Sequence, residues 1–534
     1  MTGPSDYDAY WGDFHKHASE PVSNLDRLDE ALVDARYNVD IYPVLCYPFI
    51  WTATGDIGFE YRTEDRTHWG IREETVGNRP EFHDWWHEIQ AATAEHNDPG
   101  RFVTFPAYEW NGNRRRWGDH NVIHFEEGGP LDDARDLADL YENLHSLDMP
   151  ALALPHHTAY KQGERAKDWD VFDSDLSPVM EVYSAHGSSE GVGTPVPMDS
   201  NPSMGPRTSG GTLQDGLARG HRVGVIASND SGGLPGSWDD GVAGVWATDL
   251  TREGVWEALE SRRTYGTTGD RIELWYELDD CPMGSVADPD GSATATVEVD
   301  CARPLDRVEL VGDGRVVDTY SHHGTWAYPD PDEEREFSVL VEMGWGPKPN
   351  YGDWHGTENE WVGTARVAGG RLEDVQPRFN GWGQRFERDG DACSFDLTTE
   401  RGSATYEPTQ GLVFTVVGDG ETTLEVDVED HDPLSVALGD LSGETRVVAF
   451  TEACYERVES EFGLARADID NSDLVYHNAR KLKIHPAHPR AACATTVEFD
   501  NLPTDCDYYY VRASQTDGQY AWSSPVWLDS ETDG

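Results

Sequence analysis

The period of the hydrophobic pattern changes near residue 270, and this change constrains the possible folds more than any other feature of the sequence. Before it, short apolar runs alternate with segments whose apolar residues recur at helical spacing. The expected strands are residues 41–45, 101–107, 121–125, 151–154, 179–183 and 223–227, and the expected helices are residues 25–35, 82–96, 137–147 and 252–263. Such alternation favours a parallel sheet or a βα barrel, in which reactive side chains collect at the carboxyl ends of the strands.

The sequence beyond Gly269 has the period of two that is typical of half-buried strands. Clear examples are residues 272–276, 295–299, 307–311 and 508–513. Because the last of these runs shows the same β-type pattern as the first three, we expect all four to belong to one β-sandwich. The predicted domains are residues 1–270, a β-sandwich of residues 271–340 plus 480–534, and an inserted β-rich domain of residues 341–479.

The chain is strongly acidic, with 100 Asp and Glu against 41 Lys and Arg and a formal net charge of -59. Such a surface repels phosphate backbones and anionic lipids, so we expect neither nucleic acid nor a membrane as partner. The composition, with only six Lys, resembles that of proteins from salt-accumulating archaea. At molar salt the screening length shrinks to about 3 Å, so we expect the fold to depend on salt. An anionic small-molecule substrate would need a local basic pocket.

The N-terminal residues and the apolar runs lead us to expect a cytoplasmic protein by default. The first residues have neither a basic nor an apolar region typical of a secretory signal, and no run of eighteen apolar residues exists. The seven cysteines show no CxxC spacing, which predicts neither a zinc ribbon nor a disulfide framework. The sequence makes no prediction about oligomeric state.

His15 and His17 form an HxH pair after the apolar residues 10–14. On a strand, residues two apart project to the same face, so both imidazoles could reach one metal ion. The pair alone is a weak signal, because HxH pairs are common in chains without a metal site.

Further histidines and carboxylates lie at or just beyond the ends of expected strands. They are Glu109, His120, His156, His157, Glu181, His186 and Asp230. Imidazoles and carboxylates gathered from several strand ends are the ligands that Zn, Mn or Fe require. The sequence has no nucleophile elbow, Walker loop or dinucleotide fingerprint. These absences argue against a serine hydrolase and against the common nucleotide-binding enzymes.

Several motifs together resemble the polymerase-and-histidinol-phosphatase (PHP) superfamily of metal-dependent phosphoesterases, in particular a poorly characterised group with a β-rich C-terminal extension. The matching residues are 10–17, 108–110, 118–122, 155–157, 181–187, 228–231, 262–269 and 521–525. This resemblance implies a distorted seven-stranded βα barrel followed by β-sandwich domains, with up to three metal ions in the barrel.

The resemblance also implies metal ligands. One metal position would take His15, His17, Glu109 and Asp230, and a second would share Glu109 and add His120 and His156 or His157. For the third position the sequence departs from the family pattern: Cys46-Tyr47, Ser23 and Ser231-Gly232 stand where ligands are expected. We therefore expect two divalent ions (Zn, Mn or Fe) bridged by Glu109. Glu181 and His186 are either ligands or residues that orient ligands.

Arg114, Arg115 and Arg116 are the only three consecutive cations in the chain, and they lie between Glu109 and His120. We expect them either to clamp a phosphate, sulfate or carboxylate, or to balance neighbouring acids on the surface. Arg115 is the predicted substrate-binding residue, with Glu109 and His157 as its catalytic neighbours. Lys161 and Arg165 are weaker candidates for the same role.

Three functions are compatible with these features. The leading prediction is a phosphoesterase in which a metal-bound hydroxide attacks the ester at a two-metal centre. The second keeps the metals and hydrolyses an amide, lactone or sulfate ester. In the third, the missing ligands indicate a degenerate metal-binding or carbohydrate-binding protein without enzymatic activity.

Overall fold

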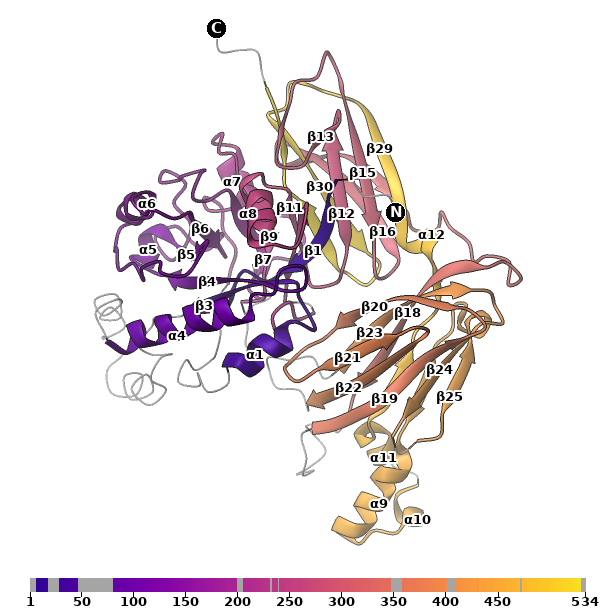
Figure 1. Cartoon of the computed structure of the whole chain (residues 1–534). Helices are drawn as coiled ribbons and strands as arrows, with labels where there is room; N and C mark the ends of the chain where they lie inside the picture. Colours follow the sequence, from indigo (N-terminus) through magenta and orange to yellow (C-terminus); the bar gives the residue numbers. More distant parts are fainter. Residues whose placement is uncertain are drawn as a thin grey trace.

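The N-terminal half of the chain folds around strands that belong to two β-sheets (Figure 1). The structure, a computed structural model, describes residues 6–17, 28–46, 80–198, 205–230, 233–238, 240–346, 358–400, 409–429, 431–470 and 473–529. The strands of the larger sheet are, in spatial order, β10 (Val242–Ala247), β1 (Asp8–Gly12), β3 (Ile41–Cys46), β4 (Val103–Trp110), β5 (Asp119–His124) and β6 (Ala151–His156), with β2 (Lys16–His17) beside β3. The smaller sheet contains β8 (Gly187–Ser188), β7 (Val179–Ser184) and β9 (Gly224–Ala227).

The two sheets mix parallel and antiparallel pairs, whereas the alternating pattern predicted parallel strands. β3 pairs in parallel with β1, β2 and β4, and β7 pairs in parallel with β9. β10 with β1, β4 with β5 and β5 with β6 are antiparallel. The connection from β4 to β5, residues 111–118, is shorter than the dozen or so residues that a parallel crossover needs, so this pair has to be antiparallel.

Both sheets nevertheless surround one apolar interior. A single core cluster takes Phe105 from β4, Ile123 from β5, Leu154 from β6, Val179 from β7 and Ile226 from β9. β7 lies beside β6, and β9 beside β11 (Thr264–Thr267), without ladder hydrogen bonds across either gap. The strands therefore enclose a core, but a bonded barrel of seven parallel strands is not confirmed.

Most of the expected elements of this half are present. The helices are α1 (Leu28–Ala35), α4 (Pro80–His96), α5 (Arg114–Trp117), α6 (Leu137–His145), α7 (Leu213–Leu217) and α8 (Arg252–Glu260). The expected strand through His17 is broken, because β1 ends at Gly12 and His15 lies between β1 and β2. The apolar pattern also missed β10 and β11, which carry small and aromatic residues.

The larger sheet continues without interruption into the C-terminal half. β11 pairs with β31 (Tyr520–Ser523), which pairs with β30 (Tyr508–Gln515). The remaining strands of this part are β12 (Glu273–Leu278), β13 (Cys281–Pro282), β14 (Val286–Ala287), β15 (Ala293–Asp300), β16 (Leu305–Gly312), β17 (Arg315–Ser321), β29 (Ala494–Leu502) and β32 (Val526–Leu528). Strands from residues 272–310 and 494–528 share one apolar core, so segments far apart in sequence form this body.

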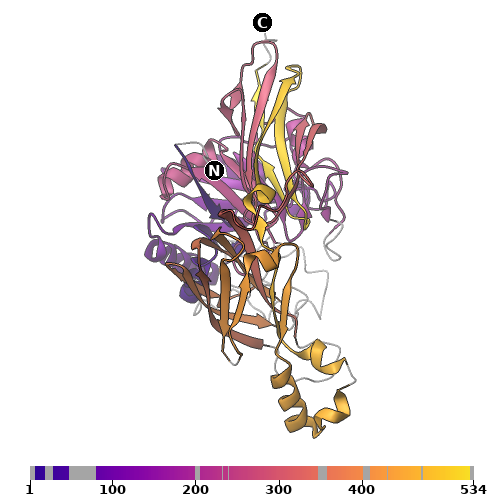
Figure 2. The same ribbon diagram turned by 90° about the vertical axis from the view of Figure 1, so that its right-hand side faces the viewer.

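Residues between these segments form a separate pair of sheets with their own core. One sheet contains β18 (Arg335–Gly344), β20 (Arg371–Arg378), β23 (Thr409–Gly418), β26 (Arg446–Ala449), β27 (Lys481–Ile484) and β28 (His488–Pro489). The other contains β19 (Glu358–Ala368), β21 (Arg385–Asp389), β22 (Ala392–Glu400), β24 (Thr423–Val428) and β25 (Leu434–Ala437). The helices α9 (Thr451–Phe462), α10 (Arg466–Ile469) and α11 (Leu474–Asn478) project from its far end (Figure 2). A short helix, α12 (Arg490–Cys493), leads back to β29.

None of the helices in the described ranges is long and apolar enough to cross a lipid bilayer.

Candidate metal centre

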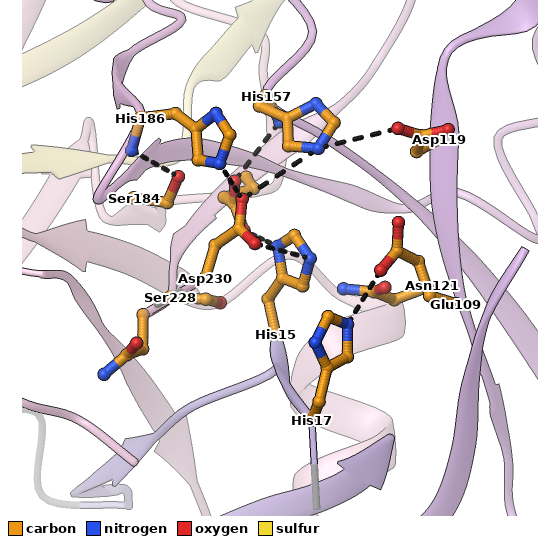
Figure 3. Close-up of polar contacts among 12 residues, drawn as sticks. His15, His17, Glu109, Asp119, Asn121, His157, Ser184, His186, Ser228 and Asp230 are labelled. Atoms are coloured by element: carbon orange, nitrogen blue, oxygen red, sulfur yellow. Dashed lines mark hydrogen bonds and ion pairs between the residues drawn. The ribbon is translucent and has the colours of Figure 1, made fainter. Parts of the chain in front are cut away.

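Buried histidines and carboxylates from separate strands converge at one end of the enclosed interior (Figure 3). His15 and His17 follow β1, Glu109 lies near the end of β4, His156 ends β6, and Asp230 follows β9. All five side chains are buried or nearly so, and the most accessible, Asp230, has 12% of its side chain exposed. The fold thus brings the predicted HxH pair next to three other predicted ligands.

Four of the converging residues form what we call the first ligand group: His15, His156, Glu181 and Asp230. One donor atom from each lies within 4.8 Å of the other three. Nε2 of His15 is 3.3 Å from Oδ1 of Asp230, and the ring centroids of His15 and His156 are 3.8 Å apart. Imidazole and carboxylate donors at this spacing can share one divalent ion.

The second ligand group contains His15, His17 and Glu109, again within 4.8 Å of one another. Nε2 of His17 is 2.7 Å from Oε2 of Glu109. The other oxygen of Glu109 accepts a hydrogen bond of 2.5 Å from the side-chain amide of Asn111. Because His15 belongs to both groups, the two candidate sites adjoin each other.

Unpartnered nitrogen atoms show that these residues fit a cation. Among the described residues, neither ring nitrogen of His156 has a hydrogen-bond partner, and the same is true of Nε2 of His15. A buried polar atom without a partner costs free energy that a bound ligand would recover. Burial lowers the pKa of His156 well below its usual value, so its imidazole is neutral and keeps a lone pair for a metal ion.

The local charge points to the same conclusion. Burial by itself would lower the pKa of His15, but the carboxylates of Asp230, Glu181 and Glu109 raise it to about 10. Negative charge that holds a proton so firmly in a buried place also attracts a divalent cation. The donor atoms and the charge of the two ligand groups therefore fit metal ions.

Neighbouring groups fix the orientation of the ligands. Oε2 of Glu181 accepts a hydrogen bond of 2.7 Å from Nδ1 of His15, which leaves Nε2 of His15 facing Asp230. Nε2 of His186 lies 2.9 Å from Oδ2 of Asp230, and its Nδ1 accepts from the hydroxyl of Tyr160. A carboxylate or hydroxyl that holds the second nitrogen of a histidine is the usual support of a metal ligand.

Asp13 connects the two chain segments that carry His15 and Asp230. Its buried carboxylate accepts hydrogen bonds from the main-chain N–H groups of His15 (3.0 Å), Asn229 (3.2 Å) and Gly236 (2.8 Å). Asp230 itself has a φ of 50°, in the left-handed region that residues other than glycine avoid. This contact network holds the strained backbone in place, a combination that is concentrated at functional sites.

His120 and Cys46 do not reach either ligand group. Successive residues of a strand face opposite sides, and on β5 Ile123 joins the interior core while Val122 joins the outer core. His120 therefore faces outward, where Nζ of Lys167 lies 3.3 Å from its Nε2. Cys46 also faces outward, and burial raises the pKa of its thiol to about 12, so it stays protonated. Ser23, Tyr47, Ser231 and Gly232 lie outside the described residues.

His157 lies beside the first ligand group rather than in it. Its Nε2 is 3.9 Å from Oδ2 of Asp230 and 3.7 Å from Oδ2 of Asp119, and its main-chain N–H donates to Glu181 at 3.2 Å. Its φ of 32° is again left-handed. Of the adjacent pair, His156 is thus the candidate ligand and His157 supports Glu181.

The structure places Arg115, the predicted substrate-binding residue, away from the centre. Its side chain is 70% exposed and pairs with Glu164 at 2.7 Å. Arg116 stacks on Trp117. Arg114 is the member of the trio that turns inward: its guanidinium binds Asp119 and lies 3.5 Å from Oε1 of Glu109.

Sequence reasoning gave no role to Asp119 or Asp13 and only a weak one to Arg165. Asp119 adjoins His120, and only the pairing of β5 with its neighbours shows which of the two faces the interior. Asp13 stands two residues before His15 in one of the motifs quoted above, which was the available signal. Arg165, eight residues after His157, binds Asp119 at 2.7 Å.

Comparison with known proteins finds a family model that matches part of the chain, and relatives without a described activity. The model of a family described as a protein of unknown function (DUF3604) matches residues 57–188 and 233–278. An uncharacterised protein of Chlamydia pneumoniae is 28% identical over 284 residues, which are 49% of this chain and 44% of that protein. Uncharacterised proteins of Chlamydia muridarum and Chlamydia trachomatis are each 26% identical over 214 residues, 37% of this chain and 34% of each relative. The chain thus spans less than half the length of these relatives.

One solved structure also aligns with this chain. It is the crystal structure of a two-domain protein from Bacteroides vulgatus that contains a predicted PHP-like metal-dependent phosphoesterase. The alignment covers 82% of this chain and 97% of that chain, with 10% sequence identity and a TM-score of 0.31. A likeness at this level carries no conclusion about the present chain.

Proposed function

We propose that the N-terminal half is a metal-dependent hydrolase that acts on phosphate esters of small anionic molecules. The observation that carries this proposal is the pair of adjoining ligand groups with buried imidazole nitrogens that lack partners within the described chain. The motifs that resemble PHP phosphoesterases favour phosphate esters over amides, lactones and sulfate esters. The reaction adds water across the ester bond and yields an alcohol and inorganic phosphate.

The ligand groups give each residue a role in this proposal. His156, Glu181 and Asp230, with His15, would hold one divalent ion, and His17 with Glu109 would hold the other. Bound Zn, Mn or Fe ions would supply activation of water and stabilisation of the charge on the phosphoryl oxygens.

The surrounding residues keep this arrangement fixed. Tyr160 and His186 position Asp230, while Glu181 positions His15. Asp13 ties the two ligand-bearing segments together through main-chain hydrogen bonds. A site held from several sides changes little on binding, which favours catalysis.

We also propose the domain division stated from the sequence: residues 1–270, 271–340 plus 480–534, and 341–479. The separate apolar cores of the two β-rich parts support the division into these parts. In the structure the core of the inserted part also takes Phe337 and Val339 before residue 341, and Leu482 and Ile484 after residue 479. The sheet that continues from β11 into β31 indicates that the first two domains form one firmly joined body.

The test combines elemental analysis with an activity assay. Protein purified in metal-supplemented buffer should contain about two transition-metal ions per chain, and 4-nitrophenyl phosphate should be hydrolysed. A chelator should abolish both properties, and Mn or Zn should restore them. His156→Ala should lower metal affinity by about 100-fold or more, because it removes a candidate ligand rather than a supporting residue.

His145→Ala is the matched control, because His145 lies on the surface at the end of α6 and pairs with Asp173. It should leave metal content and activity unchanged. A fully loaded protein that is inert toward a broad panel of phosphate esters would refute the phosphoesterase proposal. Fewer than one metal ion per chain would instead favour a degenerate scaffold.

A further inference from the structure

Two arginines converge on one buried carboxylate beside the ligand groups. Asp119 has no exposed side-chain surface and accepts hydrogen bonds from Nε and Nη2 of Arg114, at 2.9 and 2.7 Å. On its other side it accepts from Nε of Arg165 at 2.7 Å. We call these three residues the Arg–Asp–Arg cluster.

Each arginine of the cluster borders a different ligand group. Nη2 of Arg114 lies 3.5 Å from Oε1 of Glu109, in the second group. Nη2 of Arg165 lies 3.2 Å from Nε2 of His157, which is 3.9 Å from Asp230 in the first group. Because both guanidinium groups bind Oδ2 of Asp119, a ligand bound across the two groups would meet them side by side.

The cluster places two guanidinium groups beside the ligand groups of a chain whose formal net charge is -59. Both bind Asp119, and that of Arg114 also lies 3.5 Å from the carboxylate of Glu109. Both arginine side chains are 19% exposed, whereas that of Asp119 is fully buried. Guanidinium groups at this position match the planar oxygen pairs of phosphate.

Arg165 adopts a backbone conformation that residues other than glycine disfavour. Its φ of 90° lies in a region that favours glycine, and its guanidinium lies 5.6 Å from the ring centroid of Tyr160. Tyr160 in turn bonds His186, which supports Asp230. Backbone strain of this kind persists where surrounding contacts hold the residue in place, and it is concentrated at active sites and ligand-binding sites.

We infer that Arg114 and Arg165 bind the phosphoryl oxygens of the substrate and make the site selective for phosphomonoesters over phosphodiesters. A monoester has three non-bridging oxygens and a charge near −2 at neutral pH, as a phosphorylated side chain does. It can satisfy both ligand groups and still offer oxygen to the arginines. A diester has two non-bridging oxygens and one charge, so the ligand groups and the cluster compete for them. This inference rests on the proposed function.

Binding measurements test the inference without turnover. Isothermal titration calorimetry of the metal-loaded full chain would use inorganic phosphate as the monoester probe and dimethyl phosphate as the diester probe. We expect phosphate to bind at least 10-fold more tightly than dimethyl phosphate. Arg114→Gln and Arg165→Gln should each weaken phosphate binding by 10-fold or more, and should weaken dimethyl phosphate binding by less than 3-fold.

Arg115→Gln is the matched control, since Arg115 is adjacent in sequence but pairs with Glu164 on the surface. It should change neither affinity by more than 2-fold. If a glutamine variant fails to fold or to retain metal, Arg114→Lys and Arg165→Lys keep the charge beside Asp119 and remove the planar fork. These lysine variants should still lose selectivity for phosphate.

The outcomes separate this inference from the proposed function. Equal binding of the two probes, or phosphate binding unchanged in variants that retain metal, would overturn the inference and leave the hydrolase proposal standing. Selective phosphate binding that depends on both arginines would support the inference even in a protein without hydrolase activity.

Discussion

Replacing His156 by leucine should stabilise the metal-free protein, although His156 is fully buried. Neither of its ring nitrogens has a partner in the described structure, and each unsatisfied polar atom costs about 1–3 kcal/mol. An apolar side chain of similar volume removes that cost and adds a packing misfit below about 1.5 kcal/mol. We therefore expect His156→Leu to raise the free energy of unfolding of the apo protein by about 1–3 kcal/mol.

The same substitution should remove the stabilisation that metal gives to the wild-type protein. A ligand at 1,000 times its dissociation constant stabilises by about 4 kcal/mol, so wild-type protein should gain this amount when Mn or Zn is added. Differential scanning calorimetry with chelator and with metal measures both effects. The apo transition of the variant should lie roughly 2–10 °C above that of the wild-type protein, and added metal should not move it.

His124→Leu is a control of opposite sign. His124 is also buried and its Nδ1 has no partner among the described residues, but its Nε2 bonds the carbonyl oxygen of Pro130 at 3.0 Å, which leucine would leave without a donor. Its ring also packs against Trp86. Its loss should destabilise the protein by about 1–3 kcal/mol and leave the response to metal intact. If His156→Leu destabilises the apo protein by as much as the control does, the free energy assigned to the unpartnered nitrogens is wrong.

Three further predictions concern stability. Arg512→Met should lower the free energy of unfolding by about 3–5 kcal/mol, because buried Glu190, which Arg512 binds at 2.7 and 2.9 Å, loses its cation. Adding Glu190→Gln should restore part of this loss in a double-mutant cycle measured by denaturant unfolding. Additive effects of the two substitutions would contradict the coupling. Burial, and then the charge of Asp300, raise the pKa of Glu273 to about 6 from 4.5, so the folded state holds this proton more tightly and stability falls as pH rises from 4.5 to 6. Glu273→Gln should therefore stabilise the protein by about 1–2 kcal/mol at pH 7 and have no effect at pH 4, and equal effects at both pH values would disprove the assignment. Transfer from about 3 M to about 0.1 M KCl should unfold the chain, and an unchanged circular dichroism spectrum would remove the proposed salt dependence.

The hydrophobic pattern by itself determined where most strands and helices of the N-terminal half lie. β3, β6 and β7 and the helix α4 were predicted to within a few residues, because short apolar runs and the helical period of 3.6 are local properties of the chain. The pattern also located the segments that carry the candidate ligands. The HxH pair, Glu109, His156, Glu181 and Asp230 were all identified from residue type and from their position at strand ends.

Only the tertiary structure decided which of two adjacent residues enters the site. On β5 both Val122 and Ile123 are apolar and buried, so the sequence shows no alternation there. The pairing of β5 with β4 and β6, which are distant in sequence, turns Asp119 inward and His120 outward. A one-residue change of register exchanges the two faces of a strand, and no local signal fixes that register.

The same limit applies to the two pairs of neighbours that flank the centre. His156 and His157, and likewise Arg114 and Arg115, are chemically equivalent in the sequence. In the structure His156 belongs to the first ligand group and His157 lies beside it, while Arg114 borders the second group and Arg115 lies on the surface. Strand direction was equally hidden, since β4 and β5 are antiparallel because of a short connection rather than because of their composition. The sequence by itself determined the chemistry that the chain can offer, whereas long-range pairing, which depends on contacts between distant segments, decided which atoms meet.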